Sequence, residues 1–223
     1  MTGPVSALRA ENLYRFYRVG DEETLALQGV SLSVEPGETV AVVGPSGSGK
    51  STLLACLAGL DEPSGGAVSI EGVRLSHRPD GERAALRANR IGILLQTGNL
   101  LPHLTVLANL QLVQSAGRRA GQTHPQSLLQ EVRLEGRAHA LPRQLSGGEL
   151  ARAGLAVAMA NSPAVLLADE PTGELDGSLE DEVLDLLRQR AAGGTAVLLV
   201  THSMGATAVA DRVITLEDGR LLS

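Results

Sequence analysis

Cysteine and aromatic residues are scarce in this sequence of 223 residues, which has one cysteine, two tyrosines, one phenylalanine and no tryptophan. The lone cysteine, Cys56, excludes an intramolecular disulfide and fits a reducing compartment. The aromatic set of Tyr14, Phe16 and Tyr17 offers no scattered stacking platform for single-stranded nucleic acid. We therefore expect a core of leucine, valine, isoleucine and alanine.

Long apolar segments and export signals are also missing. The longest uninterrupted apolar stretches, such as residues 196–200, are far shorter than the roughly 18 to 20 residues of a membrane-spanning helix. The first residues have no apolar segment behind a basic end and no small-residue cleavage site. We expect a cytoplasmic protein whose membrane role, if it has one, comes through a partner.

Acidic residues outnumber basic ones, 25 to 19, and the formal net charge is -6. A protein whose main ligand is a phosphate backbone needs a clustered basic face. Nucleic acid is therefore not expected as a partner. Only Lys50 is a lysine among the basic residues, and its presence in an arginine-rich sequence calls for a chemical reason.

Short apolar, β-rich segments alternate with helical ones, the pattern of an α/β domain with a largely parallel sheet. The expected strands are residues 39–43, 67–70, 91–95, 164–168, 196–200 and 212–216, and the expected helices are residues 50–58, 80–89, 147–160 and 178–191. Residues 105–145 give no strong strand signal and contain the breakers Gly117, Gly121 and Pro125. We expect them to form a helical lobe inserted in a single domain.

The most specific segment is GPSGSGKS, residues 44–51, between an expected strand and an expected helix. It fits the pattern G-x-x-x-x-G-K-[ST], in which backbone N–H groups and a helix N-terminus surround phosphates. Lys50 would reach the β- and γ-phosphates, and the Ser51 hydroxyl would bind Mg²⁺. The alternative is a glycine-rich turn that binds nothing. The flanking strand and helix favour a nucleoside triphosphate site.

A second segment, VLLADE at residues 165–170, is an apolar strand that ends in two adjacent carboxylates. Beside a phosphate loop, Asp169 could hold Mg²⁺ through water. Glu170 lies on the other side of the strand and could polarise an attacking water. In isolation, such a pair would be read as an acidic strand end that meets solvent.

The third segment, LSGGE at residues 145–149, puts a hydroxyl and two glycines where a helix should begin. This is a second anion-binding helix start, although Ser146 could also be a plain N-cap. If one nucleotide occupies the first phosphate site, the second site is free to close over the γ-phosphate of a nucleotide on another copy. The segment thus predicts a head-to-tail dimer with two ATP molecules at its interface.

Together these segments resemble the ATP-binding cassette (ABC) family over nearly the whole chain. GPSGSGKS is similar to its Walker A loop, VLLADE to Walker B and LSGGE to the signature motif. Gln96 is similar to the Q-loop glutamine, GELD at residues 173–176 to the D-loop and His202 to the switch histidine. Tyr17 lies where the family often stacks an aromatic ring on adenine, and Tyr14 and Phe16 would point to the opposite face of a continuing strand.

The resemblance implies an α/β, P-loop NTPase fold with a RecA-like parallel-sheet core, an antiparallel β subdomain and an inserted α-helical lobe. The core and β subdomain would cover about residues 1–96 and 162–223 of one domain, and the lobe about residues 97–161. ATP and Mg²⁺ are the implied ligands.

The resemblance also implies the role of each site residue. ATP would be bound by Tyr17 and by the loop residues Gly44, Pro45, Ser46, Gly47, Ser48, Gly49, Lys50, Ser51 and Thr52. Ser51, Gln96 and Asp169 would surround the metal. Glu170 would be the general base, with Gln96 and His202 completing the catalytic set. The ATP of the opposite subunit would be served by Leu145, Ser146, Gly147, Gly148 and Glu149, with Asp176 in the D-loop.

Some positions depart from the family pattern. The helix after LSGGE has Ala151 and Val157 at usually polar positions and retains only Arg152, which makes this helix more apolar. Glu174 replaces the usual asparagine of the D-loop, and Ala108 stands where a glutamate is common. Every residue needed for the chemical step is present, so we expect slow to ordinary hydrolysis.

The implied function is an ATPase subunit that dimerises around two ATP, as a homodimer or with a related cassette, and drives a separate transmembrane permease. The permease would dock near Gln96 and the helical lobe and hold the cytoplasmic protein at the inner face of the cell membrane. Segments such as ADEPTGELD look most similar to the lipoprotein-release, macrolide-efflux and cell-division group. An importer ATPase, a soluble ABC ATPase acting on ribosomes or DNA and a P-loop kinase remain alternatives.

Overall fold

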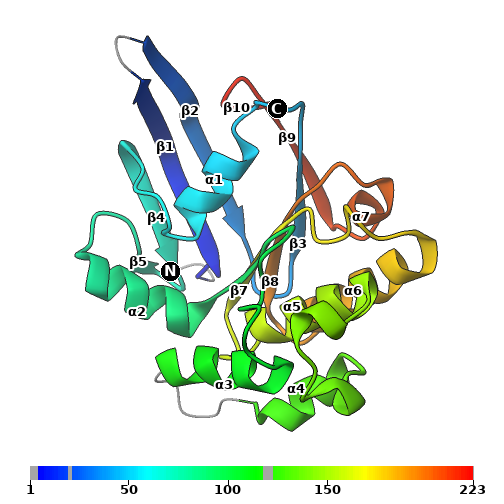
Figure 1. The fold of residues 1–223 in the computed structure, drawn as a ribbon. Helices are drawn as coiled ribbons and strands as arrows, with labels where there is room; N and C mark the ends of the chain where they lie inside the picture. Colours follow the sequence, from blue (N-terminus) through cyan, green and yellow to red (C-terminus); the bar gives the residue numbers. More distant parts are fainter. Residues whose placement is uncertain (1–4, 20–21, 118–122, 223) are drawn as a thin grey trace.

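A six-stranded sheet forms the centre of the computed structural model, which describes residues 5–19, 22–117 and 123–222 (Figure 1). Its strands are β3 (Thr39–Val43), β6 (Ile91–Leu94), β7 (Val165–Asp169), β8 (Ala196–Val200), β9 (Arg212–Glu217) and β10 (Arg220–Leu222). They follow the order β10-β9-β3-β8-β7-β6, and all neighbours are parallel except β9 and β10. The expected strands at 39–43, 91–95, 164–168, 196–200 and 212–216 are confirmed, whereas β10 was not predicted.

The middle strands are mostly apolar because helices cover both faces of the sheet. All residues of β8 are buried, and in β3 and β7 only the last residue is partly exposed. Parallel strands end at the same edge, and Asp169 at the end of β7 pairs with Val200 at the end of β8. The segments that follow β3, β7 and β8 therefore meet at one edge of the sheet.

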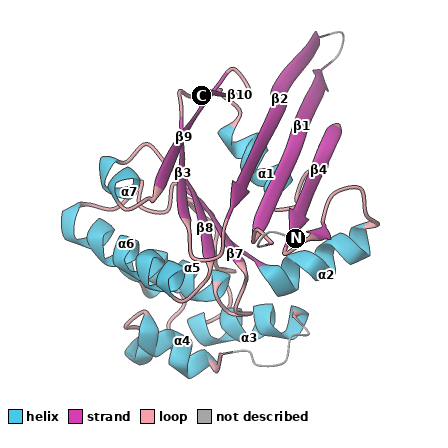
Figure 2. Ribbon diagram, turned by 180° about the vertical axis from the view of Figure 1, so that it is seen from behind, coloured by secondary structure: helices cyan, strands magenta, loops and turns pink. Residues whose placement is uncertain are grey.

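Helices on the two faces enclose two separate apolar cores (Figure 2). The helices are α1 (Lys50–Leu57), α2 (Asp80–Arg90), α3 (Val106–Ala116), α4 (Pro125–Glu131), α5 (Gly147–Ala158), α6 (Gly177–Ala192) and α7 (Met204–Ala208), with short 3-10 turns at Glu135–Arg137 and Pro142–Gln144. Leu53 and Leu57 of α1 belong to one core, and Leu155 of α5 and Leu187 of α6 belong to the other. The predicted helices at 50–58, 80–89, 147–160 and 178–191 are confirmed to within two residues, and α7 is additional.

A second, antiparallel sheet covers α1 from the other side. It consists of β1 (Leu8–Val19), β2 (Glu22–Val34), β4 (Gly65–Ile70) and β5 (Val73–Arg74) in the order β2-β1-β4-β5. The strand expected at residues 67–70 is confirmed as part of β4, but it joins this antiparallel sheet. The residue pattern predicted neither β1 nor β2.

The helices between β6 and β7 pack together at one end of the molecule, drawn in green in Figure 1. Buried leucines of α3 and α4 fill their core, among them Leu110 and Leu128. The buried Asn109 side chain fixes the start of α3, because its oxygen accepts from the Leu101 N–H at 2.7 Å and its amide donates to nearby carbonyls.

The predicted breakers act in two different ways in this region. Gly117 is the C-cap of α3, and Pro125 begins α4, where its missing N–H costs no hydrogen bond. Gly121, the third predicted breaker, lies outside the described residues. Among the described helices, none is long and apolar enough to cross a membrane.

Candidate functional site

The loop between β3 and α1 can only be formed by glycine at two positions. Gly44 and Gly49 have φ angles of 152° and 102°, in the region that L side chains rarely adopt. A Cβ atom on Gly44 would lie 2.0 Å from the Leu216 carbonyl oxygen, and one on Gly49 would lie 2.4 Å from the Ala26 carbonyl oxygen. These glycines therefore let the loop pack tightly against β9 and β2.

The other side of the loop is open. Gly47 has a φ of 82°, and no described atom lies within 4 Å of the position of its missing Cβ. No described side chain caps the start of α1, and its first turn has no acidic residue, so its N–H groups remain available to an anion. Lys50 is 8% exposed, and its ammonium donates to the carbonyls of Gly44 at 2.7 Å and Pro45 at 2.8 Å. The loop is thus a preformed phosphate cradle with the lysine folded over it.

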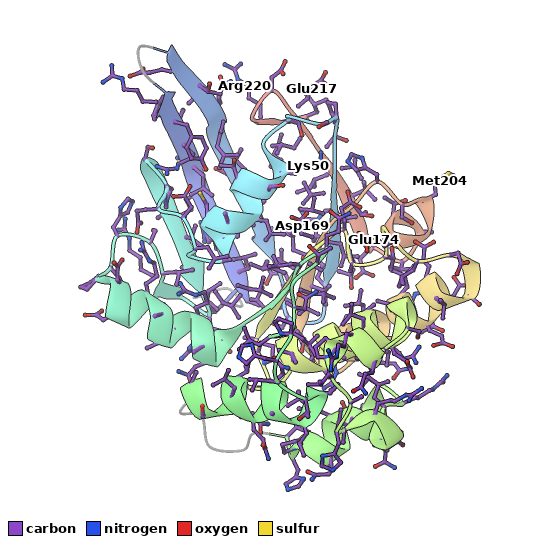
Figure 3. All side chains as sticks on the ribbon, in the orientation of Figure 1. Lys50, Asp169, Glu174, Met204, Glu217 and Arg220 are labelled. Carbon is purple, nitrogen blue, oxygen red and sulfur yellow. The ribbon has the colours of Figure 1, made fainter. Side chains whose placement is uncertain are left out.

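A cavity of about 700 Å³ lies beside this cradle and brings most of the predicted site residues together. Lys50 at the start of α1 and Asp169 at the end of β7 both line this cavity and are labelled in Figure 3. The predicted residues on its wall are Tyr17, Ser46, Gly47, Gly49, Lys50, Ser51, Thr52, Gln96, Asp169, Glu170 and His202. Gly44, Pro45 and Ser48 belong to the loop but do not line the cavity, and neither do the LSGGE residues or Asp176.

The end of β7 orients a carboxylate toward the loop after β8. Glu170 has a left-handed backbone with a φ of 46°, and its N–H donates to the Val200 carbonyl at 2.9 Å. The His202 N–H donates to Glu170 Oε2 at 3.2 Å, and His202 Nε2 lies 3.5 Å from Glu170 Oε1. The Glu170 side chain is 18% exposed and that of His202 is 58% exposed. The His202 backbone N–H thus holds the Glu170 carboxylate, and both residues line the cavity.

The environment of Asp169 raises the pKa of its carboxyl group. Burial is the largest cause, the neighbouring Glu170 charge adds to it, and the Lys50 charge opposes it. A bound cation would lower the pKa of Asp169 instead, because its charge favours the ionised carboxylate.

The described residues contain no cluster of three or more histidine, cysteine or acidic side chains that could hold a metal by themselves. Ser51, Gln96 and Asp169 nevertheless line the same cavity and present oxygen atoms. Mg²⁺ takes oxygen ligands and usually combines one or two protein groups with substrate phosphates and water. The donor set therefore fits Mg²⁺ bound together with a nucleotide.

Tyr17 is the aromatic residue that lines the cavity. Its hydroxyl donates to Asp61 Oδ2 at 2.7 Å, and the Arg15 guanidinium lies 4.6 Å from its ring centroid. Arg15 itself forms two hydrogen bonds with Asp61 and is not part of the cavity wall. The ring is therefore held at its edge by Asp61 and covered on one side by Arg15, at the wall of the cavity.

The LSGGE segment begins α5 with a complete capping box. The Glu149 N–H donates to Ser146 Oγ at 3.2 Å, and the Ser146 N–H donates to Glu149 Oε2 at 2.8 Å. Arg137 donates to the other Glu149 oxygen at 2.7 Å. A Cβ on Gly148 would lie 2.9 Å from Leu179, whereas around Gly147 no described atom comes within 4 Å of such a position. The helix start is thus held by side-chain hydrogen bonds, packed on one side and open on the other.

The departures from the family pattern have a structural basis. Val157 is buried in the core of the helical region, and Ala151 packs against that core. Arg152 donates to Glu182 at 2.6 Å and to the Val132 carbonyl at 3.1 Å, so it ties α5 to α6 and α4. The more apolar helix is therefore stabilised by packing.

No sequence motif assigns the turn between β9 and β10 to the site. Asp218 and Gly219 line the cavity, and the Gly219 N–H donates to the Ser48 carbonyl at 3.0 Å. Gln28 on β2 also lines the cavity, and its N–H donates to the Gly219 carbonyl at 2.8 Å. An Asp-Gly pair is a common turn sequence, but no local signal points to contacts this distant in sequence.

The fold and the cavity define a P-loop ATPase of the ABC type, with a parallel core, an antiparallel sheet and inserted helices. A family model described as ABC transporter matches residues 27–173. The chain therefore belongs to the ABC transporter family. It is an ATPase with ATP as its ligand, and a second cassette and a membrane permease are the partners that this family implies.

Individual relatives agree with this assignment. The lipoprotein-releasing system ATP-binding protein LolD of Xylella fastidiosa is 44% identical over 99% of this chain and 93% of its own length. The macrolide export ATP-binding/permease protein MacB 2 of Aeromonas hydrophila is 40% identical over 96% of this chain, which spans 34% of that protein. The dimeric structure of the bacterial ABC transporter cassette MJ0796 has a TM-score of 0.88 at 35% identity, covering 97% of both chains. A dimeric post-hydrolysis state of MJ0796 with ADP and Pi is equally similar, at 34% identity.

Proposed function

We propose that this chain hydrolyses ATP with Glu170 as the general base. The preformed phosphate cradle and the adjacent Glu170–His202 pair support this assignment. The loop at residues 44–52 binds the phosphates through backbone N–H groups and Lys50. Tyr17 stacks on the base. The single most telling observation is the 3.2 Å hydrogen bond from the His202 N–H to Glu170 at the wall of the cavity.

In this mechanism Glu170 accepts the proton of the attacking water while the water oxygen forms a bond to the γ-phosphorus. The bond between that phosphorus and the leaving ADP oxygen breaks. His202 contacts the γ-phosphate and orients the water. Ser51, Gln96 and Asp169, together with water, would hold Mg²⁺, which would supply charge neutralisation for the bound phosphates.

The signature segment acts in the second copy. Ser146, Gly147 and Gly148 lie outside the cavity of their own chain, and the open side of this helix start suits a phosphate presented by another subunit. We propose two ATP molecules sandwiched between two cassettes, either two copies of this chain or this chain and a related one. Leu145, Glu149 and the D-loop residue Asp176 shape the same interface.

The partner is a permease of the lipoprotein-release, efflux or mechanotransmission type, as the similarity to LolD and MacB suggests. We propose one domain with a helical lobe at about residues 97–161, and we place permease docking near Gln96 and this lobe. The exposed leucines Leu95 and Leu101 near Gln96 support an apolar contact there. The chain would then work at the inner face of the cell membrane.

The experiment compares Glu170→Gln with the parent and with Glu135→Gln, an exposed carboxylate remote from the cavity. Glu170→Gln should bind ATP, stop turnover and accumulate as an ATP-bound dimer in size-exclusion chromatography with light scattering. Turnover equal to that of the parent would show that Glu170 is not the base. The trapped variant is then used with ATP to pull partners from membranes. A permease with a large extracytoplasmic domain supports the proposed partner, and ribosomal or DNA-repair proteins without a permease contradict it.

A further inference from the structure

A carboxylate in the first turn of α6 joins the two loops that carry Glu170 and His202. Thr172 Oγ1 donates to Glu180 Oε1 at 3.0 Å, and Ser203 Oγ donates to the same oxygen. We propose that Glu180 is a positioning residue for the hydrolytic pair, an inference that rests on the proposed function of Glu170 and His202.

The Thr172 and Ser203 hydroxyls each lie close in sequence to one residue of the Glu170–His202 pair. Thr172 is 3% exposed and follows Glu170 by two residues, and the Gly173 N–H donates to the Glu170 carbonyl at 3.1 Å to close the turn. Ser203 directly follows His202, and its N–H donates to Thr201 Oγ1 at 3.0 Å. A displacement of either hydroxyl would therefore move the residue beside it.

The surrounding contacts limit how far Glu180 can move. Ser203 Oγ also accepts from the Ala206 N–H at 3.1 Å, so the same hydroxyl caps α7. A Cβ on Gly205 would lie 3.2 Å from Glu180 Oε1, which shows how closely α7 approaches the carboxylate. Helices α6 and α7 lie next to each other in Figure 1.

Glu180 does not line the nucleotide cavity among the residues that the structure describes, so it acts on the chemistry only through its neighbours. One of its carboxyl oxygens accepts from two hydroxyl donors. The geometry that these bonds maintain is the 3.2 Å contact between the His202 N–H and Glu170. The simpler explanation is that Glu180 only complements the positive end of the α6 dipole.

Three variants separate positioning from helix stabilisation. Glu180→Ala removes the shared acceptor, Glu180→Gln keeps an acceptor oxygen at the same place, and Asp181→Ala removes an exposed carboxylate from the same helix turn. We expect Glu180→Ala to lower kcat about tenfold or more, because small displacements of reacting groups have effects of this size. The KM for ATP and the affinity for ATP should stay near those of the parent. Glu180→Gln should restore most of kcat, although it also removes the charge, and Asp181→Ala should behave like the parent.

Parent-like kcat in Glu180→Ala would overturn the inference. So would equal loss of kcat in Glu180→Gln and Glu180→Ala, since loss of the charge alone would then explain both. If Glu180→Ala fails to fold, Thr172→Val provides the test, because it replaces one donor by a methyl group of similar size. Its kcat should fall with KM unchanged, and an unchanged kcat would contradict the proposal.

The same variants distinguish failure of the role of Glu180 from failure of the proposed function. If Glu170→Gln still hydrolyses ATP, the base assignment fails and the positioning role fails with it. If Glu170→Gln is inactive while Glu180→Ala is as active as the parent, only the role of Glu180 is refuted.

Discussion

Replacing Ser146 can separate its role as a helix cap from its proposed role at the ATP of a second subunit. The cap uses Ser146 Oγ as an acceptor for the Glu149 N–H, so the hydroxyl proton is not consumed by this bond. In Ser146→Ala both functions are lost. In Ser146→Asn the cap is retained, since asparagine caps helices about as well as serine, but the larger side chain occupies the open side of the helix start.

The expected stability effects follow from the capping box. Loss of the side-chain acceptor in Ser146→Ala should cost about 1 kcal/mol of unfolding free energy. For a domain of this size, that corresponds to a fall in Tm of about 2 to 4 °C. Ser146→Asn should melt near the parent temperature. Thr105→Ala, which removes the cap of α3 through the same kind of bond at 3.2 Å, should lower Tm by a similar amount.

The ATPase assay at a temperature well below all melting transitions should rank these variants differently. A hydrogen bond to a charged group is worth about 1.5 to 3 kcal/mol, so loss of the Ser146 contact to phosphate should reduce turnover about tenfold or more. We expect this reduction in Ser146→Ala and Ser146→Asn, with ATP binding to the single cassette retained, and none in Thr105→Ala. If Ser146→Asn keeps its Tm and hydrolyses ATP like the parent, the shared site is refuted.

Three further predictions concern groups elsewhere in the structure. Burial raises the pKa of the Cys56 thiol to about 12, so Cys56 should not react with a disulfide reagent at pH 8 until the protein is unfolded, and rapid native reaction would contradict its buried position. The raised pKa of Asp169 means that the folded state binds this proton more tightly than the unfolded state, so its contribution to stability is lost as pH rises through the folded pKa. Asp169→Asn should therefore raise the Tm of the nucleotide-free protein at pH 7, by less at acidic pH, and abolish Mg²⁺-dependent turnover. Gly219 has a φ of 75°, and a Cβ there would lie 2.8 Å from the Ala26 carbonyl oxygen. Gly219→Val should therefore lower the free energy of unfolding by about 2 kcal/mol and weaken ATP binding in a fluorescent-nucleotide titration. The control Gly81→Ala should do neither.

The central strands could be predicted because burial on both faces makes them continuous apolar runs. The outer strands could not, because their side-chain alternation is interrupted. In β1 the buried residues Leu8 and Ala10 are followed by Leu13, and the pairing with β2 shifts register at this point. Asn12, with a φ of 48°, lies inside this irregularity. A bulge moves later side chains to the opposite face, so a period of two no longer describes the strand.

The site was predictable to the extent that its chemistry is local in sequence. The phosphate loop and the carboxylates at the end of β7 are short segments whose residue order is itself the signal. Contacts between distant segments carry no such signal. Asp61, which holds the Tyr17 hydroxyl, and Glu180, which joins two loops, are ordinary carboxylates in the sequence. Their roles emerge only when the fold brings their partners to them.

The open cavity suggests how ATP hydrolysis could be tied to dimer closure. With His202 58% exposed at the cavity wall, water screens the charges around the γ-phosphate position in the single cassette. Covering this opening with a second cassette would exclude bulk water and strengthen each electrostatic interaction at the reacting phosphate. Hydrolysis would then be favoured mainly in the closed dimer, and the products would remove the γ-phosphate contact that holds the dimer together. A cycle of this kind would deliver motion to an attached permease.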